Sequence, residues 1–477
     1  MRKIFITLVL IVLSANICSA SHPLDTNWRS YIYDKQAWEL GPVHKILTKN
    51  NKLFASGMFG MRFYDSLHFN GIAQLKDSLW VPLGSGTSAG IRGFFPVVND
   101  MTLKDSLLYV GGSFDSAGTQ KAYNLAYYNT NSETWSGIGD SIFGGVLSLQ
   151  LKDNDLFVAG SFDSLKIAND TVPFNYIAKW TGSSWDSLGA GLNGTVYNMT
   201  LKGNELFVVG EFDTAGTAKA NNIAIWNDST NTWSAYGDKG PIGEVTTLCK
   251  VENDMYFAGD FDKVYTGTDT IDCKNIVKWD GTSWDSLGSG ITGDIMEMKA
   301  DSNILYVVGS FTKTIDDTVN CYHIVKWVDN EWKPMGSGTD LYIYTVSVAG
   351  DSVLIGGTFN FTGDTLNQKI GLWYNTANSQ NKRQDDYTIA NTDIKLNIFP
   401  NPADHESIIE FYLEQSVFAE IKIYDLQGKH LLTLAEDQFS PGKNRVIWDN
   451  NEYPPGVYLC KIIINGSEVK TKKIIKE

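Results

Sequence analysis

Acidic side chains are the most numerous residues in this sequence that could carry chemistry. The 477-residue chain holds 54 Asp and Glu residues against 39 Lys and Arg, which gives a net charge of −15. Pairs of carboxyl groups act as acid and base in glycoside hydrolysis, but the sequence alone does not single out one pair. An acidic excess of this size is a poor electrostatic match for nucleic acid, so we expect no nucleic-acid partner.

Signatures of other chemistries are missing from the sequence. It contains no Gly-x-Ser-x-Gly, His-Glu-x-x-His, Walker or dinucleotide-binding motif. A loop such as Asp153-Asn154-Asp155 could hold calcium, although the twelve-residue spacing of an EF-hand is absent. We therefore predict no catalytic residue, no metal site and no cofactor, while calcium binding stays open. Enzymatic activity also stays open, and a non-catalytic role is favoured.

The cysteines do not predict a disulfide scaffold, because five in a chain of this length are too few. Cys273 and Cys321 occupy equivalent places in neighbouring repeats, and Cys249 lies in the same repeat as Cys273. No pairing can be deduced from these positions.

A repeat of about fifty residues must position any site. The triplet Gly-x-Phe recurs seven times, from Gly57-Met58-Phe59 to Gly357-Thr358-Phe359, with a mean period of 50 residues. Each repeat contains four short runs rich in β-branched and aromatic residues, bounded by turn-forming residues. Four short strands make one small antiparallel sheet, so the pattern predicts an all-β fold with a seven-bladed β-propeller. A β-sandwich array is the alternative, but its domains would be about 100 residues each.

The two ends of the repeat region predict closure of a ring. The seventh repeat stops at Trp373 and lacks a fourth strand of the Trp-x-x-apolar-Gly type. The segment Trp38-Glu39-Leu40-Gly41, ahead of the first repeat, has that pattern and is one residue shorter. We expect this N-terminal strand to complete the last blade, because closure removes open sheet edges. The tryptophans that end third strands are expected to pack between blades rather than to bind sugars.

One polar position recurs in the first strand of every repeat. It precedes an apolar residue that lies eleven positions before each Gly of Gly-x-Phe. These residues could ring a central channel with mixed charge, or they could form a solvated channel wall, which is the favoured interpretation. The candidate ring consists of Lys45, Asp100, Ser148, Asn198, Thr247, Glu297 and Thr345.

The loop between the first two repeats is longer than its counterparts. It carries Arg92, Phe94 and Phe95 among glycines. Such a loop suits a contact surface, and local packing of the two phenylalanines is an equally good interpretation.

The N-terminal residues are typical of an export signal. Arg2 and Lys3 precede an apolar run that is shorter than the roughly 20 residues needed to span a bilayer. Small residues follow, and we predict a signal peptide over residues 1–20, cut between Ala20 and Ser21.

Residues 21–374 form the predicted propeller, and about residues 31–374 of it resemble known propellers. The run Leu108-Tyr109-Val110-Gly111-Gly112-Ser113-Phe114 resembles kelch and galactose-oxidase-type repeats, and more closely those of the fungal cortical polarity-marker family. The resemblance implies the fold and says little about function, because one fold hosts many functions. Oxidase chemistry is not implied, because the propeller histidines His44, His68 and His323 are scattered over different repeats.

A polar linker over residues 375–392 precedes a second module at residues 393–477, which has the strand pattern of a small β-sandwich. Its motifs are Ile398-Phe399-Pro400-Asn401-Pro402, Pro455-Gly456-Val457-Tyr458 and the basic end that contains Lys472 and Lys473. In this order they resemble the C-terminal sorting domain of Bacteroidota type IX secretion. The resemblance implies a secretion machine as partner and a place outside the cell or on its surface. Cys460 departs from the apolar or aromatic residue that is usual in the family, and we expect it to be a small buried hydrophobe.

These observations favour an exported, surface-displayed propeller that acts as a binding or adhesion module. Its surface ligand, carbohydrate or protein, is not identified by the sequence. The alternative is a secreted hydrolase or lyase that acts on polysaccharide.

Overall fold

A computed structural model describes most of the chain. The described residues are 27–30, 41–50, 52–57, 70–76, 79–84, 90–93, 96–139, 141–167, 170–236, 239–363, 365–366, 369–375, 396–413, 417–425, 430–440, 442–464 and 467–476. They form an all-β fold in which every strand pair is antiparallel. Within these residues, no helix has the length and apolar character needed to cross a membrane.

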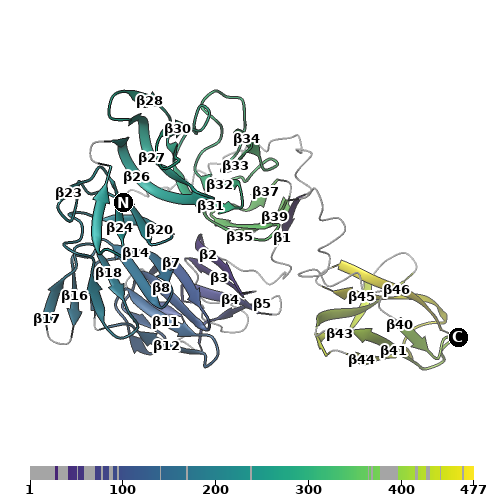
Figure 1. Cartoon of the computed structure of the whole chain (residues 1–477). Helices are drawn as coiled ribbons and strands as arrows, with labels where there is room; N and C mark the ends of the chain where they lie inside the picture. Colours follow the sequence, from purple (N-terminus) through teal and green to yellow (C-terminus); the bar gives the residue numbers. More distant parts are fainter. Residues whose placement is uncertain are drawn as a thin grey trace, which may run out of the picture.

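The repeats fold into successive sheets with four main strands each (Figure 1). The first sheet contains β2 (Val43–Lys49), β3 (Lys52–Gly57), β4 (Ile72–Lys76) and β5 (Leu79–Pro82). The second contains β7 (Val97–Lys104), β8 (Leu107–Ser113), β11 (Leu125–Asn129) and β12 (Thr134–Gly137). The third contains β14 (Val146–Lys152), β15 (Asp155–Gly160), β18 (Ile177–Trp180) and β19 (Trp185–Ser187).

The remaining repeats continue this order. The fourth sheet contains β20 (Val196–Lys202), β21 (Glu205–Gly210), β24 (Ile223–Asn227) and β25 (Thr232–Ala235). The fifth contains β26 (Gly240–Val251), β27 (Asp254–Tyr265), β29 (Ile276–Trp279) and β30 (Trp284–Ser286), with β28 (Thr270–Asp272) paired to β27. The sixth contains β31 (Ile295–Asp301), β32 (Ile304–Gly309), β33 (Ile324–Val328) and β34 (Glu331–Pro334). The seventh contains β35 (Ile343–Ala349), β36 (Ser352–Gly357), β39 (Ile370–Tyr374) and β1 (Trp28–Ser30).

The loops that connect the main strands contain additional short strands. One group is β6 (Ile91–Arg92), β9 (Ser116–Ala117) and β10 (Gln120–Lys121), and another is β13 (Ser141–Phe143), β16 (Ser164–Ile167) and β17 (Asp170–Pro173). Two hairpins complete the set, β22 (Thr214–Ala215) with β23 (Ala218–Lys219) and β37 (Phe361–Thr362) with β38 (Thr365–Leu366).

The first strand of each sheet lies innermost. Each inner strand contacts the inner strand of the next sheet, and β35 of the seventh sheet contacts β2 of the first. The sheets are therefore arranged around a common centre (Figure 1). Second strands such as β15 and β21 have five buried residues in a row, because neighbouring sheets cover both of their faces.

The Gly-x-Phe triplet has a backbone role at the end of each second strand. The Gly160 amide donates a hydrogen bond to the Tyr176 carbonyl (3.1 Å), and the Tyr176 amide donates to the Phe162 carbonyl (2.9 Å). A Cβ at Gly160 would lie 2.0 Å from the Gly145 carbonyl oxygen, so only glycine fits there. The triplet therefore joins three strand ends, which explains its recurrence.

The tryptophans of the outer strands pack in pairs and link the sheets. Trp180 faces Trp185 across one hairpin, with ring centroids 5.2 Å apart, and the same pairing recurs at Trp327 and Trp332. The Trp332 indole donates to the Leu287 carbonyl of the preceding sheet (3.0 Å). These tryptophans pack in and between the sheets.

The strand that completes the seventh sheet differs from the expected one. Strand β1 pairs with β39 so that Trp28 faces Trp373, with ring centroids 4.9 Å apart. The Trp28 indole also donates to the Met335 carbonyl of the sixth sheet (3.3 Å), as Trp332 does toward the fifth. Trp28 therefore occupies the place that the sequence suggested for Trp38, and Trp38 to Leu40 lie outside the described residues. The tryptophan that pairs with β39 is Trp28 rather than Trp38, because the strand register places Trp28 opposite Trp373.

The C-terminal strands form two packed sheets around their own core. One sheet contains β40 (Leu396–Phe399), β41 (Glu406–Leu413) and β44 (Gly442–Asp449). The other contains β43 (His430–Phe439), β42 (Val417–Tyr424), β45 (Gly456–Ile464) and β46 (Ser467–Lys476). Fully buried Ile409, Ile421, Trp448 and Cys460 lie in the core between them, so Cys460 is a small buried hydrophobe here.

Candidate functional site

A β-bulge precedes each of the seven ring residues. In every inner strand the pairing register shifts immediately before the ring position, as between Val146 and Ser148 or between Ile295 and Glu297. A bulge bends a strand and redirects the side chain that follows it. The recurring polar position is therefore set by a local backbone feature that every repeat shares.

The ring residues bond to neighbouring sheets. Ser148 Oγ accepts a hydrogen bond from the Met199 amide (3.1 Å), and Thr345 Oγ1 accepts one from the Ile46 amide (3.1 Å). In each case the donor follows the ring residue of the next sheet. The same link joins Asp100 to Leu149 (2.8 Å) and Glu297 to Val346 (2.9 Å). Asn198 Nδ2 instead donates to Thr247 Oγ1 (3.1 Å).

Four of the ring residues are almost completely buried. Ser148, Thr247, Glu297 and Thr345 are all at most 5% exposed. A buried polar group without a partner is costly, so each bond of this kind stabilises the contact between two sheets. Neighbouring sheets, rather than water alone, therefore satisfy the ring residues.

Lys45 is the one cation of the ring. Its Nζ lies 2.7 Å from Glu297 Oε1 and 3.1 Å from Asp100 Oδ1. Burial by itself would lower the pKa of Lys45, but the two carboxylates raise that pKa above its ordinary value. Burial would likewise raise the pKa of Glu297, whereas Lys45, Lys299 and the Val346 amide lower it to about 2. Lys45 and Glu297 are therefore both charged at neutral pH.

The candidate contact loop is partly described. Phe94 and Phe95 lie outside the described residues. Arg92 is half-buried in β6, and its guanidinium donates to the Gly118 carbonyl (2.5 Å). Arg92 thus has a local partner in its own loop cluster.

The loops at one edge of the sheets expose large apolar side chains. Antiparallel pairing places the start of each first strand, the end of each second and the start of each third at the same edge, which we call the Gly-x-Phe face. On this face Tyr322, Tyr342 and Phe361 are between 37% and 46% exposed. They come from the sixth and seventh sheets, and the loops that carry them are adjacent, because the Thr339 amide donates to the Tyr322 carbonyl (3.0 Å) and the Phe361 amide donates to Asp340 Oδ1 (2.9 Å). We call these three residues the aromatic cluster.

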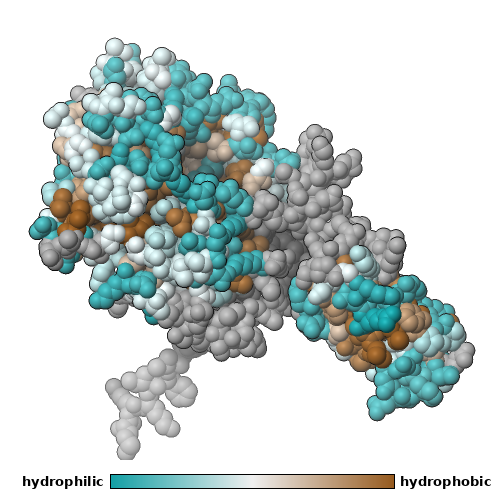
Figure 2. All heavy atoms as spheres, turned by 60° about the horizontal axis from the view of Figure 1, so that its bottom comes forward, coloured by the Kyte–Doolittle hydropathy of each residue, from teal (hydrophilic) through white to brown (hydrophobic). Residues whose placement is uncertain are grey.

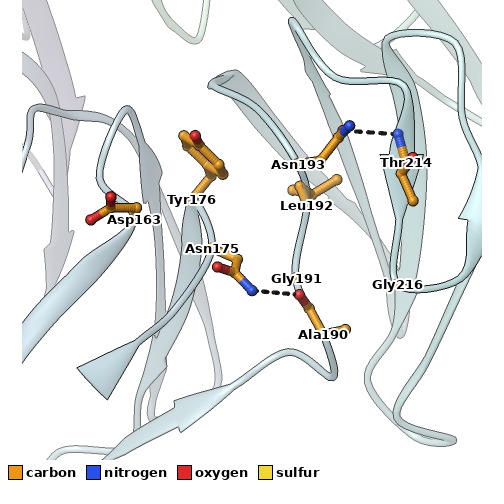
Figure 3. A pocket seen from close by; sticks show the side chains of 9 residues that line it. All are labelled: Asp163, Asn175, Tyr176, Ala190, Gly191, Leu192, Asn193, Thr214 and Gly216. Atoms are coloured by element: carbon orange, nitrogen blue, oxygen red, sulfur yellow. Dashed lines mark hydrogen bonds between the residues drawn. The ribbon is translucent and has the colours of Figure 1, made fainter. Parts of the chain in front are cut away.

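A pocket of about 320 Å³ lies between the third and fourth sheets on the same face (Figure 3). Asp163, Asn175 and Tyr176 line it from the third sheet, and Leu192, Asn193 and Thr214 line it from the other side. The Asn175 amide group donates to the Ala190 carbonyl (2.8 Å), and Asn193 accepts from the Thr214 amide (2.9 Å). The lining is therefore polar and fixed by hydrogen bonds, with one aromatic side chain.

Tyr176 occupies a backbone position that other sheets fill differently. The residue before every third strand has a left-handed backbone, with φ between 62° and 77°. In three sheets it is Asn, whose amide group bonds to a carbonyl of the next sheet's loop, as Asn222 does to Gly243 (2.7 Å). The seven residues at this position are Gly71, Asn124, Tyr176, Asn222, Asn275, His323 and Lys369. The sequence patterns did not predict this position, although an alignment of the repeats on their third strands shows Tyr176 as an exception.

His323 and Lys369 also depart from Asn at this position. His323 packs against Tyr342, with ring centroids 5.3 Å apart, and burial lowers its pKa. Lys369 Nζ donates to the Thr358 carbonyl and to Asn360 Oδ1, both at 2.8 Å. Lys369 therefore binds the loop of its own sheet, whereas Tyr176 borders a pocket.

The described residues offer no ready metal centre. Among them, no group of three or more His, Cys, Asp or Glu side chains is arranged to hold a metal ion. The described cysteines Cys249, Cys273, Cys321 and Cys460 are buried and unpaired, and burial raises the pKa of each thiol to about 12. Such thiols are protonated and poor nucleophiles at neutral pH.

The C-terminal motifs meet in space although they are far apart in sequence. Asn401 Nδ2 donates to the Lys473 carbonyl (2.9 Å), and Asn401 Oδ1 accepts from the Ile475 amide (2.8 Å). Lys472 Nζ donates to the Leu396 carbonyl (2.9 Å). The Pro400-Asn401-Pro402 turn is thus bound to the basic last strand. In the second motif, which includes Gly456 and Val457, the Tyr458 hydroxyl donates to the Pro454 carbonyl (2.6 Å).

This C-terminal unit matches a known family model. Residues 397–477 match the secretion system C-terminal sorting domain. The protein is therefore exported through type IX secretion to the cell surface or the outside. Ala20 and Ser21, the expected signal cleavage residues, lie outside the described residues.

The repeats match a second family model. Residues 96–178 and 152–288 match the Rax2 C-terminal beta propeller domain. The resemblances to the cortical polarity-marker propellers and to the type IX sorting domain are thereby confirmed, as is the all-β propeller fold. No curated protein matches the chain.

Solved structures show low similarity to this chain. The computationally designed Ika8 protein has 11% identity and a TM-score of 0.43, covering 71% of this chain and 97% of the designed one. PorZ, a surface component of the type-IX secretion system of Porphyromonas gingivalis, has 12% identity, a TM-score of 0.35 and coverage of 92% and 66%. The extracellular domain of a one-component system from B. thetaiotaomicron has 11% identity, a TM-score of 0.44 and coverage of 91% and 57%. This chain thus spans less than two thirds of the latter two proteins.

Proposed function

We propose that the protein is a binding or adhesion module displayed at the cell surface. In this proposal residues 1–20 are a signal peptide, residues 21–374 form one seven-bladed propeller, and a linker over residues 375–392 leads to the sorting module at residues 393–477. The aromatic cluster of Tyr322, Tyr342 and Phe361 is the observation that carries it. Exposed apolar side chains that gather on loops at one face are typical of a contact surface. Figure 2 shows hydrophobic patches among hydrophilic side chains on its visible face.

Binding is favoured over polysaccharide cleavage. A glycosidase commonly needs two carboxyl groups about 5–9.5 Å apart around the scissile bond. Of the nine residues that line the pocket, only Asp163 is acidic. The pocket therefore supplies one carboxylate rather than the pair that hydrolysis requires.

The test is retention of the purified protein on an array of polysaccharides, glycans and surface proteins. We expect specific retention without release of products, and weaker retention for the double variant Tyr342→Ser/Phe361→Ser. Tyr412→Ser is the matched control, because Tyr412 is 53% exposed but belongs to β41 of the C-terminal sheets. Product release would favour the hydrolase or lyase, and absence of any retention would contradict the binding role.

A further inference from the structure

The pocket beside Tyr176 has the chemistry of a sugar site. We propose that it binds one or two neutral saccharide units, with the ring of Tyr176 against a sugar face and the Asp163 carboxylate and Asn175 carbonyl oxygen accepting hydrogen bonds from sugar hydroxyls. The inference rests on the proposed binding function and adds a ligand class and a site to it.

Tyr176 is a poor choice of residue for the scaffold alone. A bulky side chain at φ 70° is disfavoured, whereas Asn tolerates this conformation well. Asn at this position would also bond to the next sheet, as Asn222 and Asn275 do. Here the preceding residue, Asn175, bonds to the same connecting loop at a different carbonyl, that of Ala190. Part of the Tyr176 side chain packs against the core that contains Leu192 and Phe212, and the rest borders the pocket. A residue held in such a disfavoured backbone conformation is often retained for a function.

The side chains that line the pocket have the chemical character that sugar binding needs. Asp163 and Asn175 come from one side of the pocket, and Asn193 and Thr214 come from the other (Figure 3). These are carboxylate, amide and hydroxyl groups, which pair with the many hydroxyls of a sugar. The nine lining residues include no Lys, Arg or His, so an anionic ligand would lack a counter-charge. The polar lining likewise disfavours a purely apolar ligand.

The pocket is small, and one of its walls is rigid. A pocket of about 320 Å³ is at the small end of the range for small-molecule sites. Asn193 is fixed by bonds to the Asp213 and Thr214 amides (3.0 and 2.9 Å) and by its own donation to Asp213 (2.6 Å). These bonds hold one wall in place before a ligand arrives, which lowers the entropic cost of binding.

The experiment measures sugar binding by the full-length protein with saturation-transfer NMR and calorimetry. The probes are glucose, galactose, mannose, N-acetylglucosamine, cellobiose and lactose. We expect at least one probe to bind, and Tyr176→Asn to weaken its affinity about tenfold, because one aromatic contact is lost. Tyr176→Phe keeps the ring and should bind nearly as well as the parent. Asp163→Asn should weaken binding through the lost charged acceptor.

Tyr176→Asn is also a variant that should fold. It installs the residue that three other sheets carry, which relieves the left-handed backbone at φ 70° but removes the packing of the ring against the core, so its thermal midpoint should stay close to that of the parent. Tyr123→Asn is the matched control, because Tyr123 is an exposed aromatic at the corresponding edge of the second sheet and does not line the pocket. Absence of binding for every probe, or affinity unchanged in both Tyr176→Asn and Asp163→Asn, would overturn the inference. If the surface array still retains the protein in that case, the proposed binding function survives and only the sugar site fails.

Discussion

The Lys45 ammonium of the first sheet lies 2.7 Å from the Glu297 carboxylate of the sixth sheet. This ion pair joins two sheets that are not adjacent, because β35 of the seventh sheet lies between β31 and β2 in the order of contacts. Because Lys45 also lies 3.1 Å from Asp100, one cation joins three sheets. It therefore restrains the inner strands in a way that bonds between adjacent sheets do not.

Removal of this cation should destabilise the protein strongly. In Lys45→Met the carboxylates of Glu297 and Asp100 would stay largely buried without their partner, and breaking such a pair costs about 3–5 kcal/mol. Lys76→Met is the matched control, because Lys76 and Glu133 form an exposed pair whose loss costs about 0–1 kcal/mol. Denaturant unfolding of both variants measures the difference. Equal losses in the two variants would show that the central pair adds nothing special.

Acid should weaken the same contact. Burial alone would raise the pKa of Glu297, but Lys45, Lys299 and the Val346 amide lower it from its ordinary value of 4.5 to about 2. A lowered pKa contributes stability that is fully present above pH 4.5 and is lost as pH falls toward 2. We expect the thermal midpoint of the parent to fall more steeply over this range than that of Glu297→Gln, with Glu133→Gln as control. Parallel pH profiles for parent and Glu297→Gln would contradict the assignment.

Local sequence patterns predicted the strands better than they predicted which residues bond to one another across the sheets. The Gly-x-Phe period marked each second strand, because the close approach at Gly160 is a local demand on backbone space. The ring position was also visible, since it follows the same bulge in each repeat. What Ser148 or Glu297 bonds to was not visible, because its partner lies about fifty residues away in another sheet.

Two misses have the same origin in long-range contact. Trp28 and Trp38 both precede the first repeat, and only the register with Trp373 decides between them. The pocket beside Tyr176 depends on two loops from different sheets, so no single motif marks it. A comparison of equivalent positions across the repeats would have singled out Tyr176, because three sheets carry Asn at this position and the third sheet carries Tyr.

The assignment of the closing strand can be tested by single substitutions. Trp28 is 1% exposed, packs against Trp373 and bonds to the Met335 carbonyl, so Trp28→Ala should cost about 3–5 kcal/mol of unfolding free energy. Trp38→Ala is the matched comparison and should cost less. Denaturant unfolding of both variants decides between them. A larger loss in Trp38→Ala would restore the strand that the sequence pattern first suggested.

Asn401 should be needed for a stable sorting module and for export. Its side chain makes two hydrogen bonds to β46, to the Lys473 carbonyl and from the Ile475 amide. Asn401→Ala leaves both backbone groups without this partner, which should cost about 1–3 kcal/mol. We expect less protein outside the producing cell and more inside, measured by fractionation and immunoblotting. Asn451→Ala is the control, because exposed Asn451 bonds to His405 and Asp449, away from β46. Normal export of Asn401→Ala would contradict this prediction, because the secretion machine would then recognise the module without these two hydrogen bonds.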